Sequence, residues 1–158
     1  MKTHSPIKRH QALVSFSKDH HFGLLLVWKI RQGLKKAVVN GRISNYVLYF
    51  FNEDLAKHFS DEEQMLFDQL PADDILRLRA EAEHKMIYDL VTSIGKKKDD
   101  AALLNNLADE LEKHIRFEER EFFDHIQNII PENELREITS RFTNDSKTVD
   151  EKWNDVFW

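Results

Sequence analysis

Apolar residues recur along the chain with the spacing of an α-helix, and a few glycines and prolines interrupt this pattern at similar intervals. Gly41, Pro71, Gly95 and Pro131 mark these interruptions. The segment Tyr46–Phe51 is rich in residues that favour strands, but the apolar face that contains it is too long for a strand. Four long helices are therefore predicted, over about residues 17–40, 44–70, 72–94 and 100–128.

The similar lengths of these helices predict an all-α fold, an up-down-up-down four-helix bundle that forms a single domain over residues 1–158. Ser17 is expected to be the N-cap of the first helix, and Gly41 its C-cap. Pro131 is expected at the first position of a short C-terminal helix. We expect the aromatic residues of the tail to cover helix one at Trp28, with a dimer contact as the alternative. These tail residues are Trp153, Phe157 and Trp158.

Composition narrows the classes of function. The chain has no cysteine, which excludes iron–sulfur clusters and zinc–thiolate sites and fits a reducing cytoplasm. A net charge of −5 with interspersed signs provides no basic surface for nucleic acid. The longest apolar run, Leu24–Trp28, is too short to span a membrane, and the N-terminus does not resemble a signal peptide. We therefore expect a soluble cytoplasmic protein that binds neither nucleic acid nor membranes.

A short polar motif occurs twice. The segment His58-Phe-Ser-Asp-Glu62 returns 56 residues later as His114-Ile-Arg-Phe-Glu118. A Phe-Asp pair follows each copy at the same distance, at Phe67-Asp68 and Phe123-Asp124. Because residues four apart lie on one face of a helix, each copy points an imidazole and a carboxylate in the same direction.

The position of this motif favours a metal site over surface ion pairs. One exposed His–Glu pair would stabilise a helix by only about 0.2–0.5 kcal/mol. Both copies, however, lie on the stripe that otherwise carries Leu, Phe and Met, where unpaired carboxylates are costly to desolvate. Helices one and three each add a histidine within their apolar stripes, at His20 and His84. Four histidines and two glutamates then converge, as in the di-metal sites of helix bundles.

The order of these residues resembles the hemerythrin-like, HHE cation-binding family over roughly the first 130 residues. A ferritin-type site would instead have Glu-x-x-His motifs and further glutamates. The matching elements are Asp19-His20, His58 to Glu62, His84, and His114 to Glu118. The resemblance implies a non-haem di-iron centre, bridged by two carboxylates and an oxygen atom, that binds dioxygen or responds to oxygen, iron or redox state. The ligands it implies are His20, His58, Glu62, His84, His114 and Glu118.

Two departures distinguish this chain from the oxygen-carrying hemerythrins. Those proteins have a second histidine where this chain has Tyr88, and their helix-four carboxylate corresponds to Glu119. The helical face and the repeat favour Glu118 instead. Two six-coordinate ions offer about twelve positions, of which about two remain open if neither Tyr88 nor His21 binds. Open positions make reversible carriage less favourable than sensing or oxidative chemistry, and some hemerythrin-like iron sensors are more similar to this chain.

Several neighbouring residues keep alternative roles. His21 could replace His20 as a ligand, although only His20 lies on the main stripe. Tyr88 is either a core tyrosine, a hydrogen-bond donor or a ligand. Gly23 either leaves room for a small ligand or is a tolerated helical glycine. We expect Glu63 and Glu119 to face solvent, and His125 to lie outside the ligand shell.

The leading hypothesis is a binding protein that holds two iron ions and, through them, dioxygen or a related small ligand. The second is an oxidase- or peroxidase-type enzyme with Tyr88 as hydrogen-bond or electron donor. The third is a metal-poor or zinc-filled interaction module. Zinc and manganese also suit imidazole and carboxylate ligands, so the residues alone do not select iron. A monomer or weak homodimer is expected.

Overall fold

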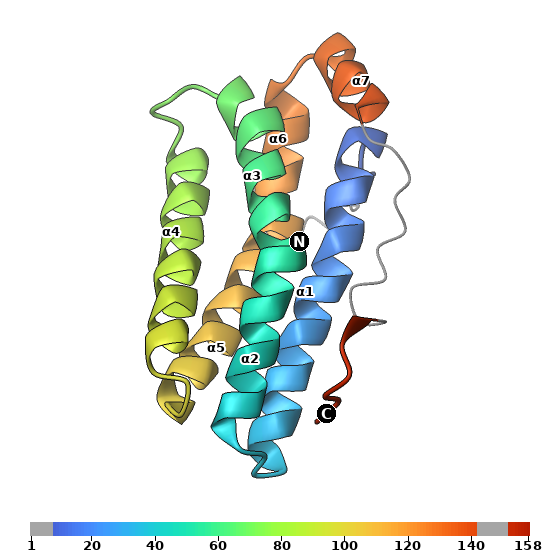
Figure 1. The fold of residues 1–158 in the computed structure, drawn as a ribbon. Coiled ribbons are helices and arrows are strands. Elements are labelled where there is room, and N and C mark those ends of the chain that lie inside the picture. Colours follow the sequence, from blue (N-terminus) through green and yellow to red (C-terminus); the bar gives the residue numbers. More distant parts are fainter. Residues whose placement is uncertain (1–7, 142–151) are drawn as a thin grey trace, which may run out of the picture.

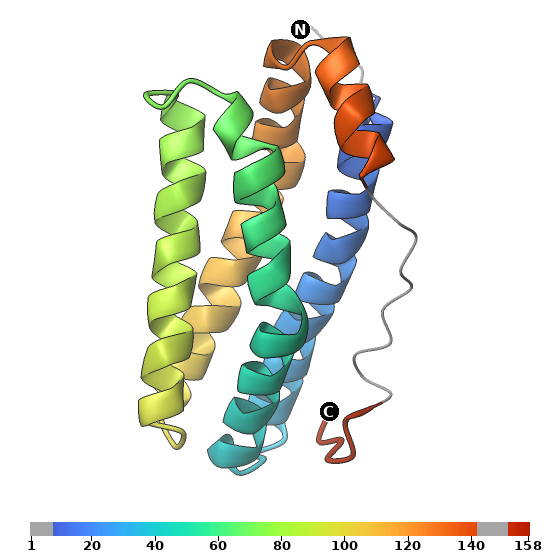
Figure 2. The same ribbon diagram turned by 45° about the horizontal axis from the view of Figure 1, so that its top comes forward.

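The chain forms a bundle of helical rods that run alternately down and up (Figure 1). The computed structural model describes residues 8–141 and 152–158, and within these ranges it contains helices and turns but no strand. The rods are α1, α2 with α3, α4, and α5 with α6, and the short helix α7 packs against α1 (Figure 2). The predicted all-α bundle with a short C-terminal helix is confirmed.

Helix α1 covers Gln11–Lys35 and begins earlier than predicted. Its N-cap is His10, whose ring nitrogen accepts a hydrogen bond from the backbone N–H of Ala12 at 2.9 Å. The prediction of Ser17 as N-cap is therefore wrong. The helix extends upstream because Ala12 and Leu13 are buried on the same face as the rest of the apolar stripe.

The second rod is continuous but contains one wide turn. Helix α2 (Asn40–Phe50) passes into the π-helical turn η1 (Phe51–Leu55) and then into α3 (Ala56–Met65). Ala37 has a φ of 56° and turns the chain sharply between α1 and α2. Gly41 consequently lies in the first turn of α2, and its predicted role as C-cap of the first helix is wrong.

The remaining helices have the predicted order, with boundaries shifted by a few residues. They are α4 (Ile75–Lys96), α5 (Ala101–Phe117), the π-helical turn η3 (Glu118–Phe122), α6 (Phe123–Ile129) and α7 (Glu132–Ser140), with a 3₁₀ turn η2 at Phe67–Gln69. Asp74 and Asp100 cap α4 and α5 with their side chains. Pro131 is the N-cap of α7, one position before the place predicted for it.

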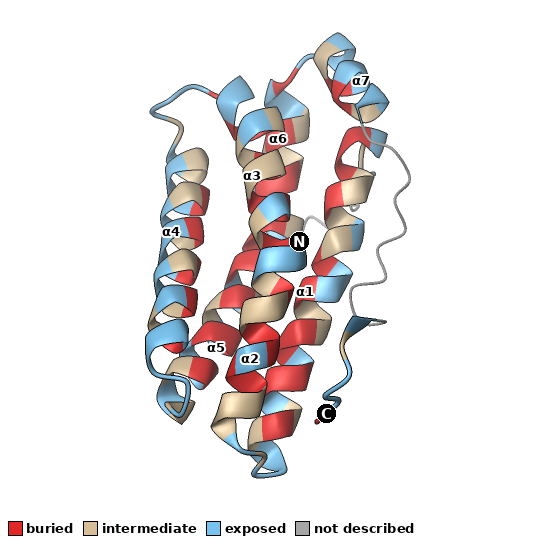
Figure 3. Cartoon of the chain, viewed as in Figure 1, coloured by how far each residue is buried: buried red, intermediate tan, exposed pale blue. Residues whose placement is uncertain are grey.

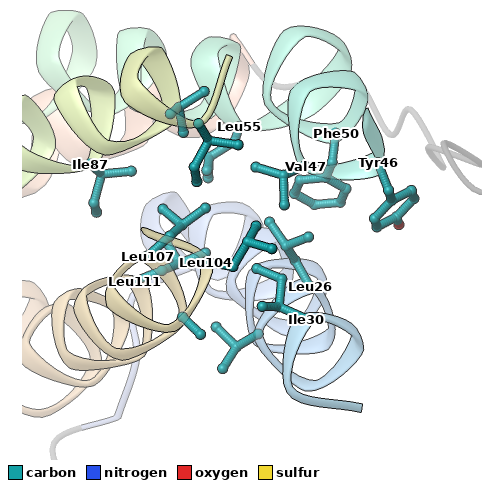
Figure 4. Packing of buried hydrophobic residues seen from close by; sticks show 14 of the residues in the cluster. Leu26, Ile30, Tyr46, Val47, Phe50, Leu55, Ile87, Leu104, Leu107 and Leu111 are labelled. Atoms are coloured by element: carbon teal, nitrogen blue, oxygen red, sulfur yellow. The ribbon is translucent and has the colours of Figure 1, made fainter. Parts of the chain in front are cut away.

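The bundle interior consists of two apolar clusters, so that buried residues line the inner face of every rod (Figure 3). The larger cluster includes Leu26, Val47 and Leu111 and fills the half of the bundle near α2 (Figure 4). The other cluster includes Phe67 and Phe122 and fills the opposite half. Between them, each rod contributes buried polar side chains in place of apolar ones. Among the described residues, no helix is long and apolar enough to cross a lipid bilayer.

The aromatic tail packs on the second rod as well as the first. Trp158 and Phe157 contact the ring of Tyr46, and Trp158 also lies over the ammonium group of Lys29 at 4.0 Å. Trp28 remains 49% exposed. The expectation that the tail covers Trp28 is therefore wrong, because α1 turns a different face, with Lys29, toward the tail.

The cap of α4 provides a test of the fold. Asp74 accepts a hydrogen bond from the Arg77 backbone N–H at 2.9 Å and contacts the His125 ring at 2.7 Å. Asp74→Ala should lower the free energy of unfolding by about 1 kcal/mol in urea denaturation, because the first turn of α4 loses its partner. Asp73→Ala, one residue earlier in an exposed turn, should change it much less.

The effect of Asp74→Ala should also depend on pH. Burial raises the pKa of the Asp74 carboxyl, but the hydrogen bonds with Arg77 and His125 lower it below its ordinary value of 3.8. A lowered pKa stabilises the fold above 3.8, and this stabilisation is lost as the pH falls through the pKa of the folded state. The two proteins should therefore become equally stable in acid. A difference that persisted at pH 2 would contradict this role of the carboxylate.

Candidate metal centre

All six side chains that the sequence analysis singled out lie in one buried layer between the two apolar clusters. Each is at most 4% exposed. The layer contains His20 from α1, His58 and Glu62 from α3, His84 from α4, His114 from α5, and Glu118 from η3. The four rods thus bring together every residue of the predicted set.

The six residues form two groups that share both carboxylates. One group consists of His20, His58, Glu62 and Glu118, and the other of Glu62, His84, His114 and Glu118. Within each group, one ligand atom per residue lies within 4.8 Å of the others. Two imidazoles and two shared carboxylates therefore surround each of two adjacent positions, a pattern that suits a pair of ions.

The contacts inside the layer leave polar atoms without hydrogen-bond partners. The Nε2 atoms of His58, His84 and His114 approach a carboxylate oxygen at 3.0–3.4 Å without the alignment of a hydrogen bond. Both oxygens of Glu62 and one of Glu118 also lack a partner among the described residues. Buried polar atoms in this state are costly, and a cation between them would satisfy lone pairs on all of them. The residues present therefore fit a metal.

Each imidazole of the layer is held from behind by a second carboxylate. The Nδ1 atoms contact carboxylate oxygens at 2.7–3.1 Å, in the pairs His20–Glu119, His58–Asp19, His84–Glu63 and His114–Glu83. A carboxylate at Nδ1 makes this nitrogen the donor and turns the Nε2 lone pair inward, as in many metal sites. Glu63 and Glu119, expected to face solvent, remain 42% and 32% exposed, but both also reach across to a histidine of a neighbouring helix.

These contacts repeat with pseudo-twofold symmetry. The residue after each shared glutamate contacts a histidine of α1 or α4. Glu119 contacts His20, and Glu63 contacts His84. The residue before each of these histidines holds the other histidine of its pair, as Asp19 holds His58 and Glu83 holds His114. The repeat in the sequence therefore extends to the shell around the layer.

Charge is balanced within the layer by the imidazoles. Burial lowers the pKa of His114, but the charge of Glu118 and hydrogen bonds with Glu118 and Glu83 raise it to about 10. The other three histidines also have raised pKa values, because neighbouring carboxylates outweigh burial. Burial raises the pKa of Glu118, yet the charge of His114 holds it well below its usual value. In the absence of a cation, protons on the imidazoles would offset the buried carboxylates, and a bound cation would take the place of these protons.

The structure also places the residues with alternative roles. His21 is exposed, whereas His20 lies in the layer. His125 contacts Asp74 instead of the layer. Gly23 allows close packing of α1 on α5, since a Cβ there would lie 2.7 Å from Ile115 Cδ1. Tyr88 is half-buried against the rings of Phe51 and Phe59.

Two arginines reinforce the outer carboxylates and were not found by sequence reasoning. Arg79 Nε donates to Glu83 at 3.0 Å, and Arg9 donates to the Glu119 carboxylate at 3.2 Å and to its carbonyl oxygen at 2.8 Å. Glu83 could have been suggested by its place beside His84, which matches Asp19 beside His20. No spacing indicates Arg9, because it lies on a segment outside the repeat.

The outer carboxylates can be tested through metal affinity. Glu83→Gln removes the charge at His114 Nδ1 and should weaken metal binding by about 10- to 100-fold, since the imidazole loses orientation and basicity. Competition with a chelator of known affinity would measure the change. Glu81→Gln is the matched control on the same helix, where the carboxylate accepts from Arg77 instead. Equal affinities in the two variants would remove Glu83 from the centre.

Comparison with known proteins identifies the family. The model of the hemerythrin HHE cation binding domain matches residues 28–126, more than half of the chain. No curated protein matches. No solved structure matches either. The matched range includes His58, Glu62, His84, His114 and Glu118 but not His20, which the fold nevertheless brings into the same layer. The chain belongs to the hemerythrin HHE cation-binding family.

Proposed function

We propose that the buried layer is a non-haem di-iron centre. The ligands are His20, His58, Glu62, His84, His114 and Glu118. The observation that carries this proposal is the pair of ligand groups that share both glutamates. The Nε2 atoms and carboxylate oxygens that lack hydrogen-bond partners support it, because a cation between them would satisfy their lone pairs. Imidazole and carboxylate also suit zinc and manganese, so the family and the doubled site favour iron.

The protein's own residues would set the properties of this centre. Four imidazoles and two shared carboxylates would fill about eight of the twelve positions of two six-coordinate ions. About four would be left, or about two once the oxygen bridge that the family resemblance implies is counted. Bound iron would supply redox chemistry and affinity for oxygen-derived ligands. The outer carboxylates keep the four rings oriented, and the two apolar clusters exclude bulk water from both ends of the layer.

We therefore propose a binding protein of the hemerythrin type, which binds dioxygen or a related small ligand or senses oxygen, iron or redox state. Oxidase- or peroxidase-type catalysis is the second candidate. It is favoured by one observation, a pocket that is lined by both Tyr88 and His84 and borders the layer. In that case Tyr88 would act as a hydrogen-bond or electron donor.

The iron content of the protein tests the proposal. Protein from iron-replete cells should contain about two iron ions per chain by elemental analysis, because the layer offers two equivalent positions. His58→Ala and Glu118→Ala should each lower this occupancy sharply. His125→Ala, which alters a histidine outside the layer, should retain both ions. Full occupancy in the first two variants would contradict the assignment of these residues as metal ligands.

The visible spectrum tests the role of Tyr88. Burial and the charge of Glu63 raise the pKa of the phenol, which disfavours a phenolate ligand. The spectrum of the oxidised iron protein should therefore change little in Tyr88→Phe. Loss of a broad charge-transfer band in this variant would instead establish Tyr88 as a ligand. Iron content measured in the same samples separates this outcome from loss of metal.

A further inference from the structure

A pocket opens on the surface between α3 and α4, next to the buried layer. Its volume is about 540 Å³. The residues that line it include Glu63, Gln64, Phe67, Arg77, His84 and Tyr88. His84 is both a wall of this pocket and a member of the layer, with its Nε2 atom unpartnered and turned toward Glu62. The pocket therefore borders one of the two ligand groups.

Glu63 lines the same pocket and contacts the ring of His84. Glu63 accepts from His84 Nδ1 at 2.9 Å, and its own side chain is 42% exposed. His84 is only 1% exposed, so the pocket wall is closed at this ring, and a small molecule would pass only when neighbouring side chains move. A shift of the Glu63 carboxylate, which is partly exposed, would open the wall beside the His84 ring.

The charges of the pocket are largely satisfied by its own walls. Arg77 donates to Glu81 and to the Leu70 carbonyl oxygen, both at 2.8 Å. Lys85 donates to Asp89 at 3.0 Å. With both cations engaged, the pocket provides no strong site for a large anion. Its chemistry suits a small ligand, neutral or singly charged, that passes through.

The matching region of the other half has a different covering. Phe67 stacks on His84 with ring centroids 5.2 Å apart, and its repeat counterpart Phe123 stacks on His20 at 5.3 Å. Arg9, however, lies over the Phe123 ring at 5.2 Å and binds Glu119, the counterpart of Glu63. The two halves thus have equal ligand sets but different coverings.

We infer that the pocket between α3 and α4 is the entrance through which small exogenous ligands, of the size of dioxygen or azide, reach the group that contains His84 and His114. The role of the ligands in this inference rests on the proposed metal centre, whereas the position of the pocket does not. It assigns access to one of two otherwise equivalent positions. Because Arg9 lies over Phe123 and binds Glu119, the position at His20 and His58 would exchange ligands more slowly.

The first experiment needs no iron. In the full chain, free of metal or loaded with diamagnetic zinc, dissolved dioxygen should enhance the NMR relaxation of nearby ring protons. The enhancement at Phe67 should exceed that at Phe123 at least twofold, although both rings are buried and equivalent in the repeat. An equal or greater effect at Phe123 would overturn the inference, whether or not the protein binds iron.

The second experiment uses the oxidised, iron-loaded protein with azide as the probe. Gln64→Trp fills the mouth of the pocket and should slow azide binding at least tenfold, with an unchanged equilibrium constant. Arg120→Trp is the matched control, since Arg120 is exposed and is the repeat counterpart of Gln64. Equal binding rates in the two variants would contradict the entrance.

Iron content, thermal melting and the resting spectrum of each variant should be measured before the azide rates. A wild-type protein without iron would refute the proposed function, and the dioxygen experiment would then decide the inference. Normal iron content with equal azide rates would refute the inference and leave the proposed function intact.

Discussion

The burial of four imidazoles and two carboxylates in one layer is the constraint on which the rest of the structure depends. Each group would lose much hydration free energy if it were left alone in an apolar interior. The bundle compensates in two ways: it packs the six groups against one another, and it gives every imidazole a second carboxylate at Nδ1. The apolar core is consequently split into two clusters, one on each side of the layer.

Two π-helical turns lie next to the buried layer. Turn η3 begins at Glu118, and it allows both Phe122 and Phe123 to be buried just beyond the layer. Turn η1 ends three residues before His58, in the same rod. An extra residue in a helical turn costs hydrogen-bond quality, and such turns occur often at functional sites. Here one π-helical turn lies just before the His58–Glu62 pair, and the other begins at Glu118.

The candidate ligands could be predicted from sequence because the relation within each His–Glu pair is local. Residues four apart share one face of a helix regardless of how neighbouring helices pack. This holds for His58 with Glu62 and for His114 with Glu118. The carboxylates at Nδ1 could not be predicted in this way. Glu83 contacts His114 only because two separate rods pack with these residues at the same level. The ends of α1 were mispredicted for a similar reason. Ser17 is a good cap in isolation, but burial of Ala12 and Leu13 extends the helix past it.

The internal repeat explains why the ligand sets match, and its limits explain why the two positions differ. Symmetry extends to the outer carboxylates, because these lie next to ligands in sequence and move with them. Beyond that shell the halves diverge: Arg9, which covers Glu119, comes from a segment before α1, while the position equivalent to it before α4 is Asp73. An aspartate there cannot donate to Glu63, so that carboxylate stays at the edge of a pocket. A duplicated motif therefore gives the two ligand groups matching side chains, and the unduplicated segments give these groups different surroundings.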